Sequence, residues 1–158
     1  MSLDTILEPH RRWMKKALGE AEKALDMGEV PVGAIVVQGE TVIGRGHNMV
    51  ETLKDPTAHA EMIAVTAACE TLGSKSLEGC TIYVTLEPCP MCAGALIMAR
   101  LERLVFGALD EKAGCASTLY NLVEDRRFNH RLKVISSVEA EASADLLRSF
   151  FLAKREGR

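Results

Sequence analysis

The sequence predicts an α/β fold: a three-layer α/β/α domain with a central mixed five-stranded sheet. Strand-like segments alternate with apolar helical segments, which is typical of a sheet covered by helices on both faces. The first two strands are joined by a tight turn, so the sheet must contain an antiparallel pair. Hydrophobic residues make up 47% of the 158 residues and charged residues 26%, which is typical of a globular protein. We expect a single domain spanning residues 1–158.

The first half of the chain contains two helices and a hairpin. Residues 9–27 carry hydrophobic side chains at three- and four-residue intervals, which predicts an amphipathic helix. "VGAIVV" (32–37) and "TVIGRG" (41–46) flank the turn "QGE" and predict two strands, the first of them fully buried. A second helix is expected over residues 58–72, ended by Gly73.

The second half continues the alternation of strands and helices. The β-branched segment "GCTIYVTLEP" predicts a third strand, and "PMCAGALIMARL" is an apolar helix. We expect, in order, a strand at 79–88, a helix at 90–101, a strand at 103–108, an irregular segment at 110–131, a strand at 131–137 and a closing helix at 140–155.

Several classes of protein are disfavoured by composition. No apolar run approaches the roughly 20 residues of a membrane-spanning helix, and the N-terminus lacks the pattern of a secretory signal. The odd number of cysteines, five, argues against a full disulfide framework. We therefore expect reduced thiols in a cytoplasmic protein with no membrane partner. The net charge of −3 and pI of about 5.8 count against a general nucleic-acid coat but not against a local basic patch.

The stretch "EPCPMCAG" places Cys89 and Cys92 at the start of the apolar helix. Pro90 is favoured at the first helical position, which puts Cys89 at the N-cap and Cys92 in the first turn. The positive end of a helix favours thiolates. This setting suits a redox couple, half of a zinc site or two buried thiols, so the pair alone does not decide between them.

The stretch "DPTAHAEM" starts the other helix that follows an early strand. We expect Thr57 as its N-cap, with His59 and Glu61 in the first turn. Helix N-termini and strand C-termini meet at one crevice of an open α/β sheet, so His59 should face both cysteines.

Taken together, the two stretches predict a metal site. His59, Cys89 and Cys92 would bind zinc and leave a fourth position open, as in catalytic zinc sites. Glu61 would then be a base for a water molecule. Each motif by itself is as often explained by packing, but a redox pair would account for neither His59 nor Glu61.

The combination of these motifs resembles a known family. H-x-E followed by P-C-x-x-C resembles the signature of zinc nucleobase deaminases. Further segments resemble bacterial tRNA-specific adenosine deaminases and follow one another along nearly the whole chain: "EVPVGAIVV", "HN", "DPTAHAE", "LEGCTIYVTLEPCPMCAGALIMAR", "VFGALDEKAGC", "FNHR" and "SFFLAKR".

The resemblance implies a cytidine-deaminase-like fold and one zinc ion per chain. The implied reaction is hydrolytic deamination of adenosine to inosine at the wobble position of a tRNA anticodon, by zinc-bound hydroxide with a Glu proton shuttle. It also implies a homodimer whose partner is the tRNA anticodon loop.

The resemblance also assigns residues to roles. His59, Cys89 and Cys92 would bind zinc, Glu61 would carry the proton, and Asn48 would be the amide that recognises the base. The positions that would line the RNA groove are Asp110, Lys112, Asn129, His130, Phe150, Phe151 and Arg155. Some of these positions also have structural interpretations: Asn48 fits a turn, and at least one phenylalanine fits a core anchor of the last helix.

Two segments depart from the family pattern, and more than one function fits the zinc signature. Val50 stands where a basic residue or proline is expected, and "CASTLYNL" (115–122) replaces a segment expected to contain Gly and Met. A deaminase of a free base or nucleotide (guanine, cytosine or deoxycytidylate) would share the zinc signature. "FGALDEKAG", "FNHR" and "FF" favour the tRNA enzyme, whereas the lack of a net positive charge counts against it. A catalytically silent zinc subunit and a thiol redox protein are also compatible with parts of the pattern.

Overall fold

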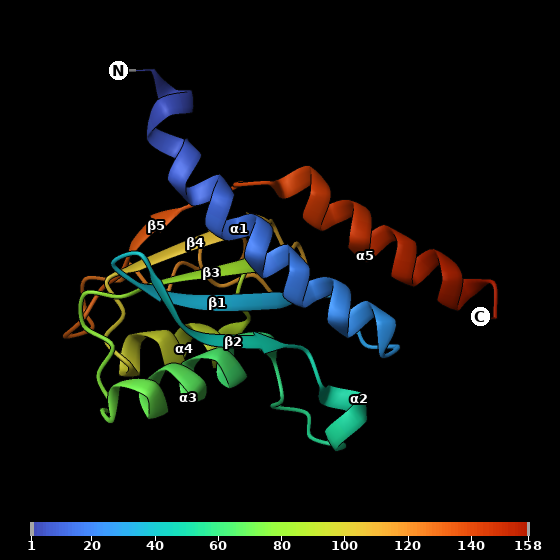
Figure 1. Ribbon diagram of the computed structural model, residues 1–158, viewed down its shortest axis with the longest axis horizontal. Coiled ribbons are helices and arrows are strands. Elements are labelled where there is room, and N and C mark those ends of the chain that lie inside the picture. Colours follow the sequence, from blue (N-terminus) through green and yellow to red (C-terminus); the bar gives the residue numbers. More distant parts are fainter. Residues whose placement is uncertain (1, 158) are drawn as a thin grey trace.

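The computed structural model describes residues 2–157. Its five strands form one sheet in the order β2-β1-β3-β4-β5. Their bounds are β1 Gly33–Gln38, β2 Thr41–His47, β3 Thr81–Leu86, β4 Arg103–Ala108 and β5 Lys133–Ile135. Strand β1 is antiparallel to both β2 and β3, whereas β3, β4 and β5 are parallel (Figure 1). The predicted mixed five-stranded sheet is therefore confirmed.

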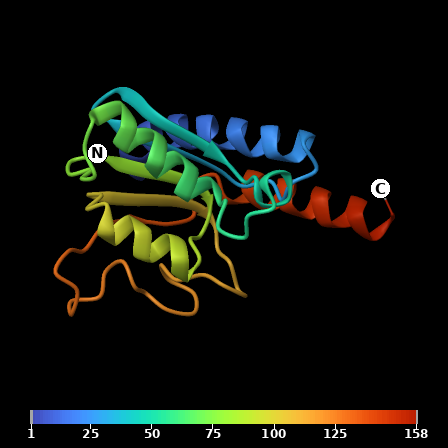
Figure 2. The ribbon, with the colours of Figure 1, turned by 90° about the horizontal axis from the view of Figure 1, so that it is seen from below.

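Helices cover both faces of the sheet, which confirms the three-layer fold. Helices α1 (Leu3–Asp26) and α5 (Ala140–Arg155) lie on one face, and α3 (Ala60–Leu72) and α4 (Pro90–Met98) lie on the other (Figures 1 and 2). A short helix, α2 (Val50–Leu53), lies outside these layers. None of the helices within residues 2–157 has both the length and the apolar character needed to cross a membrane.

Two helical features differ from the prediction. Helix α1 begins at Leu3, where Ser2 Oγ accepts a hydrogen bond from the Thr5 N–H, and it continues through Pro9. Pro9 has no N–H, so the helix lacks one backbone hydrogen bond there. The turn before Pro9 is stabilised by the Ser2 cap. Helix α2 was not predicted, because its four residues carry no periodic pattern.

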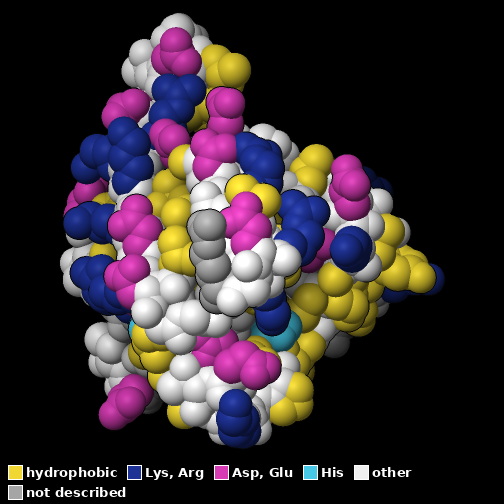
Figure 3. All heavy atoms as spheres, turned by 90° about the vertical axis from the view of Figure 1, so that its right-hand side faces the viewer, with side chains coloured by type: hydrophobic (Ala, Val, Ile, Leu, Met, Phe, Trp, Pro, Cys, Tyr) yellow, Lys and Arg dark blue, Asp and Glu magenta, His cyan; other side chains and the backbone are white. Residues whose placement is uncertain are grey.

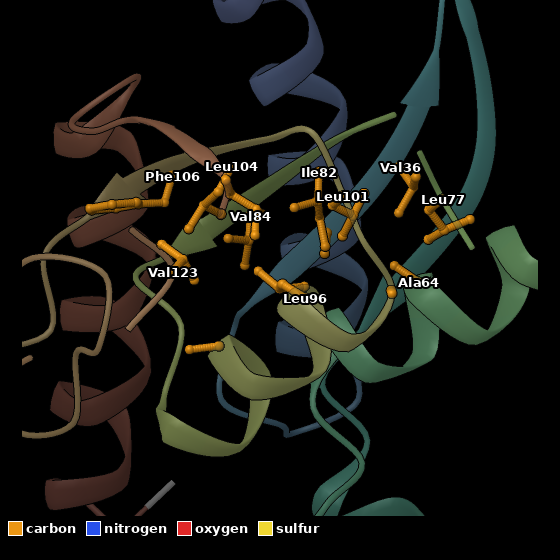
Figure 4. Close-up of a cluster of buried hydrophobic side chains, with 14 of the residues drawn as sticks. Val36, Ala64, Leu77, Ile82, Val84, Leu96, Leu101, Leu104, Phe106 and Val123 are labelled. Atoms are coloured by element: carbon orange, nitrogen blue, oxygen red, sulfur yellow. The ribbon is translucent and has the colours of Figure 1, made fainter. Parts of the chain in front are cut away.

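The main core lies between the sheet and helices α3 and α4 (Figure 4). Ile82, Leu96, Leu104 and Phe106 are fully buried there. Close to β2 the packing is tighter, because Gly44 and Gly46 lie directly against the backbone of α3 and alanines of α3 face them. Helix α3 is therefore held at backbone contact distance from the sheet.

Strand direction brings several chain segments to one edge of the sheet. Because β1 is antiparallel to both of its neighbours, β2 runs in the same direction as β3 and β4. The ends of β2, β3 and β4 therefore meet at this edge with the segment that precedes β1. Helix α5 starts half-way along the sheet, where the Val138 N–H donates to Phe106 O, and projects beyond the same edge (Figure 2).

Candidate active site

A pocket of about 370 Å³ opens at this edge of the sheet. Its walls come from the segment before β1, the ends of β2, β3 and β4, the start of α3, and the last turns of α5. Figure 3 faces this side of the molecule, where Lys and Arg side chains are interspersed with Asp and Glu and neither charge dominates. The pocket is large enough for a nucleobase.

His59 is placed by the start of α3. The predicted N-cap, Thr57, is wrong: the N-cap is His59, which has an extended backbone (φ −77°, ψ 152°) and makes no side-chain capping bond. The Thr57 hydroxyl and N–H instead bind Asp55 Oδ1 at 2.7 and 2.8 Å. This local turn ends before the helix begins, so the imidazole of His59 is free to point into the pocket.

Cys89 and Cys92 are placed by the start of α4, as predicted. Cys89 is the N-cap, Pro90 opens the helix and Cys92 is fully buried in the first turn. Both Sγ atoms lie 3.5 Å from His59 Nδ1, and the three ligand atoms lie within 4.8 Å of one another. Zn–S and Zn–N bonds of about 2.3 and 2.0–2.1 Å at a tetrahedral angle place S and N about 3.5 Å apart. The donor set therefore fits zinc.

The three side chains differ in how strongly they hold their protons. The hydrogen bond from Cys92, together with that from His59, lowers the pKa of Cys89 to about 4 against the effect of burial. The bond to Cys89 raises the pKa of His59. The neighbouring Cys89 sulfur and burial raise the pKa of Cys92. One thiolate is thus present before any ion binds, and a cation would displace the protons of the other two ligands.

Glu61 lies two residues beyond His59 and is only 4% exposed. Burial raises the pKa of its carboxyl to about 7, although a hydrogen bond from its own backbone N–H lowers the pKa in part. A carboxyl group that titrates near neutrality can both accept and donate a proton. The site therefore combines three side chains that could hold a metal ion with one buried carboxyl group that could serve as an acid or a base.

Asn48 lines the pocket, and its side-chain amide is partly used by the fold. Its Nδ2 donates to Val30 O and its Oδ1 accepts from the Val50 N–H, both at 3.2 Å. One N–H and one lone pair remain for a ligand. The turn interpretation and the recognition interpretation of Asn48 are therefore compatible.

Two buried carboxylates of the pocket wall were missed from the sequence. Glu29 accepts bonds from the backbone N–H groups of Glu51 and Thr52 and from the Thr52 hydroxyl, and thereby fixes α2. Glu87 binds the segment that follows β4 in the same way. The available signal was an acidic residue next to an apolar strand, in "GEVPVGA" and "VTLEPC".

The residues expected to line an RNA groove are dispersed. Asp110 and Phe150 line the pocket, and Lys112 is exposed on the loop beside it. Phe151 and Arg155 lie along a neighbouring apolar groove of α5.

Asn129 and His130 do not line the pocket. The His130 Nε2–H donates to Leu101 O at 2.7 Å, next to the start of β4 and therefore at the opposite edge of the sheet. Asn129 is the residue before it and is exposed.

The two departures from the family pattern leave the pocket intact. Val50 lines the wall where a basic residue or proline was expected. The segment 115–122 is ordered by bonds from Cys115 N to Pro88 O and from Leu122 N to Cys115 O. It contains no residue with positive φ, so this backbone does not need the missing glycine.

Comparison with known proteins identifies the family of this chain. The family of MafB19-like deaminases matches residues 8–155. A tRNA-specific adenosine deaminase of Bacillus subtilis is 50% identical over 91% of this chain and 89% of its own length. The chain belongs to the tRNA-specific adenosine deaminase family. A solved structure from studies of A-to-I editing by tRNA:A34 deaminases shares the fold of this deaminase with a TM-score of 0.82 and 41% identity, covering 86% of this chain and 99% of the other.

The same deaminase fold occurs in an enzyme for a free base. A guanine deaminase of Bacillus subtilis is 39% identical with a TM-score of 0.61, but the match covers 63% of this chain and 64% of that one. The fold is thus shared with a free-base enzyme, whereas 50% sequence identity over 91% of this chain is found with a tRNA-specific adenosine deaminase.

Proposed function

We propose that this protein deaminates adenosine to inosine at the wobble position of a tRNA anticodon. The proposal that tRNA is the substrate rests on the 50% sequence identity with a tRNA-specific enzyme over nearly the full length of both chains. The reaction rests on one structural observation: His59, Cys89 and the buried Glu61 line one pocket, and Cys92 completes a His-Cys-Cys donor set beside them.

We infer that His59, Cys89 and Cys92 hold one zinc ion per chain. Thiolate and imidazole are the ligands zinc prefers, and three of them leave one position for water or substrate. Zinc at this position supplies Lewis-acid chemistry that brings the pKa of a water molecule towards neutrality. About one zinc per purified chain is the corresponding measurement.

Glu61 carries the proton in this proposal. Its carboxylate takes a proton from the attacking water as the water oxygen bonds to C6 of adenine. It then gives a proton to the exocyclic nitrogen, the C6–N bond breaks, and ammonia leaves. A silent zinc subunit would not need a buried carboxyl beside its ligands, so this position favours an enzyme.

The pocket wall orients the base. Asn48 still has one N–H and one lone pair, which can meet the ring nitrogens of adenine. Asp110, Phe150 and Lys154 surround the mouth, where the nucleotides beside the reacting base would lie. Lys112, Phe151 and Arg155 extend this surface for the anticodon loop.

We also propose a homodimer located in the cytoplasm, where tRNA is present and thiols stay reduced. Asn129 and His130 are far from the pocket of their own chain, so they would contact RNA held in the partner's pocket. Met98 on α4 is 83% exposed, which provides an apolar contact for a second copy. Light scattering should give twice the chain mass of 17.2 kDa.

The decisive experiment offers the zinc-loaded protein an anticodon stem-loop with adenosine at the wobble position. Inosine should form there, and a stem-loop with the adenosine moved by one position is the matched control. Free guanine and free cytosine should remain unchanged. Turnover of guanine but not of the stem-loop would establish a free-base deaminase instead.

A further inference from the structure

Glu87 is a buried carboxylate that the proposed chemistry does not use. It follows the last residue of β3 and is 2% exposed. Among residues 2–157 no basic side chain forms an ion pair with it. A charged group at such a position is costly unless hydrogen bonds replace its lost water, so its partners indicate its role.

All of these partners belong to one segment, residues 110–118. Glu87 Oε1 accepts from the Asp110 N–H at 3.0 Å and from the Thr118 hydroxyl. Oε2 accepts from the N–H groups of Ala116 and Thr118 at 3.1 and 2.8 Å. Burial raises the pKa of Glu87, but these bonds outweigh it and the pKa is lowered. With four acceptor positions filled, the carboxylate has no capacity left for a substrate.

The segment is also shaped to fit around this carboxylate. A Cβ at Gly114 would lie 2.4 Å from Cδ and Oε1 of Glu87, so a side chain there would collide with it. The Cys115 N–H donates to Pro88 O at 2.8 Å. Segment 110–118 is therefore fastened to the turn that leads into Cys89.

The fastened segment forms one wall of the pocket, through Asp110 and Ala113, and it exposes Lys112 beside the mouth. The three metal ligands come from α3 and α4, whose first turns have their own backbone bonds, such as that from Ala93 N to Cys89 O. Loosening the segment would thus disturb the wall and leave the ligands in place.

We propose that Glu87 is a positioning residue that preorganises segment 110–118 as a substrate-binding wall. Without these bonds, the substrate must order the wall when it binds. Substrate binding must then supply the free energy of ordering, and we expect loss of these bonds to raise KM about tenfold, which is equivalent to about 1.4 kcal/mol. Because the cost is equal in the ground state and the transition state, kcat should change by less than about threefold. Only the choice of RNA as the substrate rests on the proposed function.

The experiment breaks the contact between Glu87 and the segment from both sides. Thr118→Val removes the hydroxyl bond, Gly114→Ala forces a side chain against the carboxylate, and Glu87→Gln replaces one acceptor by a donor. Thr118→Ser keeps the hydroxyl and should restore the wild-type KM. Thr71→Val is the matched control, because it removes a threonine hydroxyl that binds Ile43 O and Ala67 O away from the pocket.

Three measurements decide the outcome: KM and kcat on the stem-loop, zinc content, and hydrogen exchange of segment 110–118 without substrate. Faster exchange and a raised KM, with zinc and kcat retained, support the proposal. An unchanged KM in both Thr118→Val and Gly114→Ala overturns it, as does loss of zinc or of kcat alone. If the wild type acts only on guanine, the proposed function fails, and the same KM comparison made with guanine still tests Glu87.

Discussion

Replacing Gly46 by alanine should displace the helix that carries His59 and Glu61. A Cβ at Gly46 would lie 2.3 Å from Ala60 O and 2.7 Å from Ala64 N, both backbone atoms of α3. The first distance is about 1.1 Å shorter than the 3.4 Å at which ordinary contacts begin. Backbone atoms cannot rotate away, so the start of α3 must move by about 1 Å.

The size of the effect follows from this displacement. Overpacking of this kind costs about 1–3 kcal/mol, which corresponds to a Tm lower by roughly 3–10 °C in a chain of this size. A displacement of about 1 Å at the reacting groups can reduce turnover about 100-fold. We expect both changes in Gly46→Ala, together with weaker zinc binding.

The assay combines calorimetry, zinc titration and turnover on the stem-loop. Gly19→Ala is the control, because Gly19 lies within α1 and nothing lies within 4 Å of its added Cβ. That change should preserve turnover and keep or raise Tm. Normal Tm and turnover in Gly46→Ala would refute the conclusion that α3 is held by backbone contact.

Three further results are expected. Glu61→Gln should keep zinc and lower kcat by about 100- to 10,000-fold, the usual contribution of a general acid–base group; retained turnover would remove Glu61 from the mechanism. Chelation of the metal should abolish turnover and lower Tm, and addition of zinc should restore both. The variant Cys92→Ser should bind no zinc. Full activity of the metal-free protein would contradict the proposed zinc site. Burial raises the pKa of Tyr83 to about 12, above the unfolded value of about 10. Its contribution to stability is therefore complete below pH 10 and lost as the pH rises towards 12, and ultraviolet titration should show a late tyrosine that is absent in Tyr83→Phe.

The sequence predicted the features whose signals are local. The alternation of strands and helices gave the layers, and proline after Cys89 gave the N-cap of α4. The three candidate metal ligands could be grouped because helix starts and strand ends meet at one edge of such a sheet.

Other features depend on contacts between distant segments and left no local pattern. Glu29 and Glu87 are ordinary acidic residues in the sequence, and only folding buries them against N–H groups from other loops. Asn129 and His130 could not be placed, because the irregular segment before β5 has no period that fixes its path. Thr57 looked like an N-cap, but Asp55 had already bound its hydroxyl and its N–H.

The arrangement of α5 has a consequence for redesign of this protein. Ser143 is the buried residue of this helix. The turns after Ser143 extend past the sheet, and Phe150 and Lys154 on these turns line the pocket. The candidate metal ligands lie at the starts of helices that pack against the core, whereas the end of α5, α2 and segment 110–118 lie outside it. The parts of the chain that would select the substrate are therefore separate from the parts that would hold the metal. Grafting a different arm after Ser143 should change which molecules enter the pocket without rebuilding the centre that transforms them.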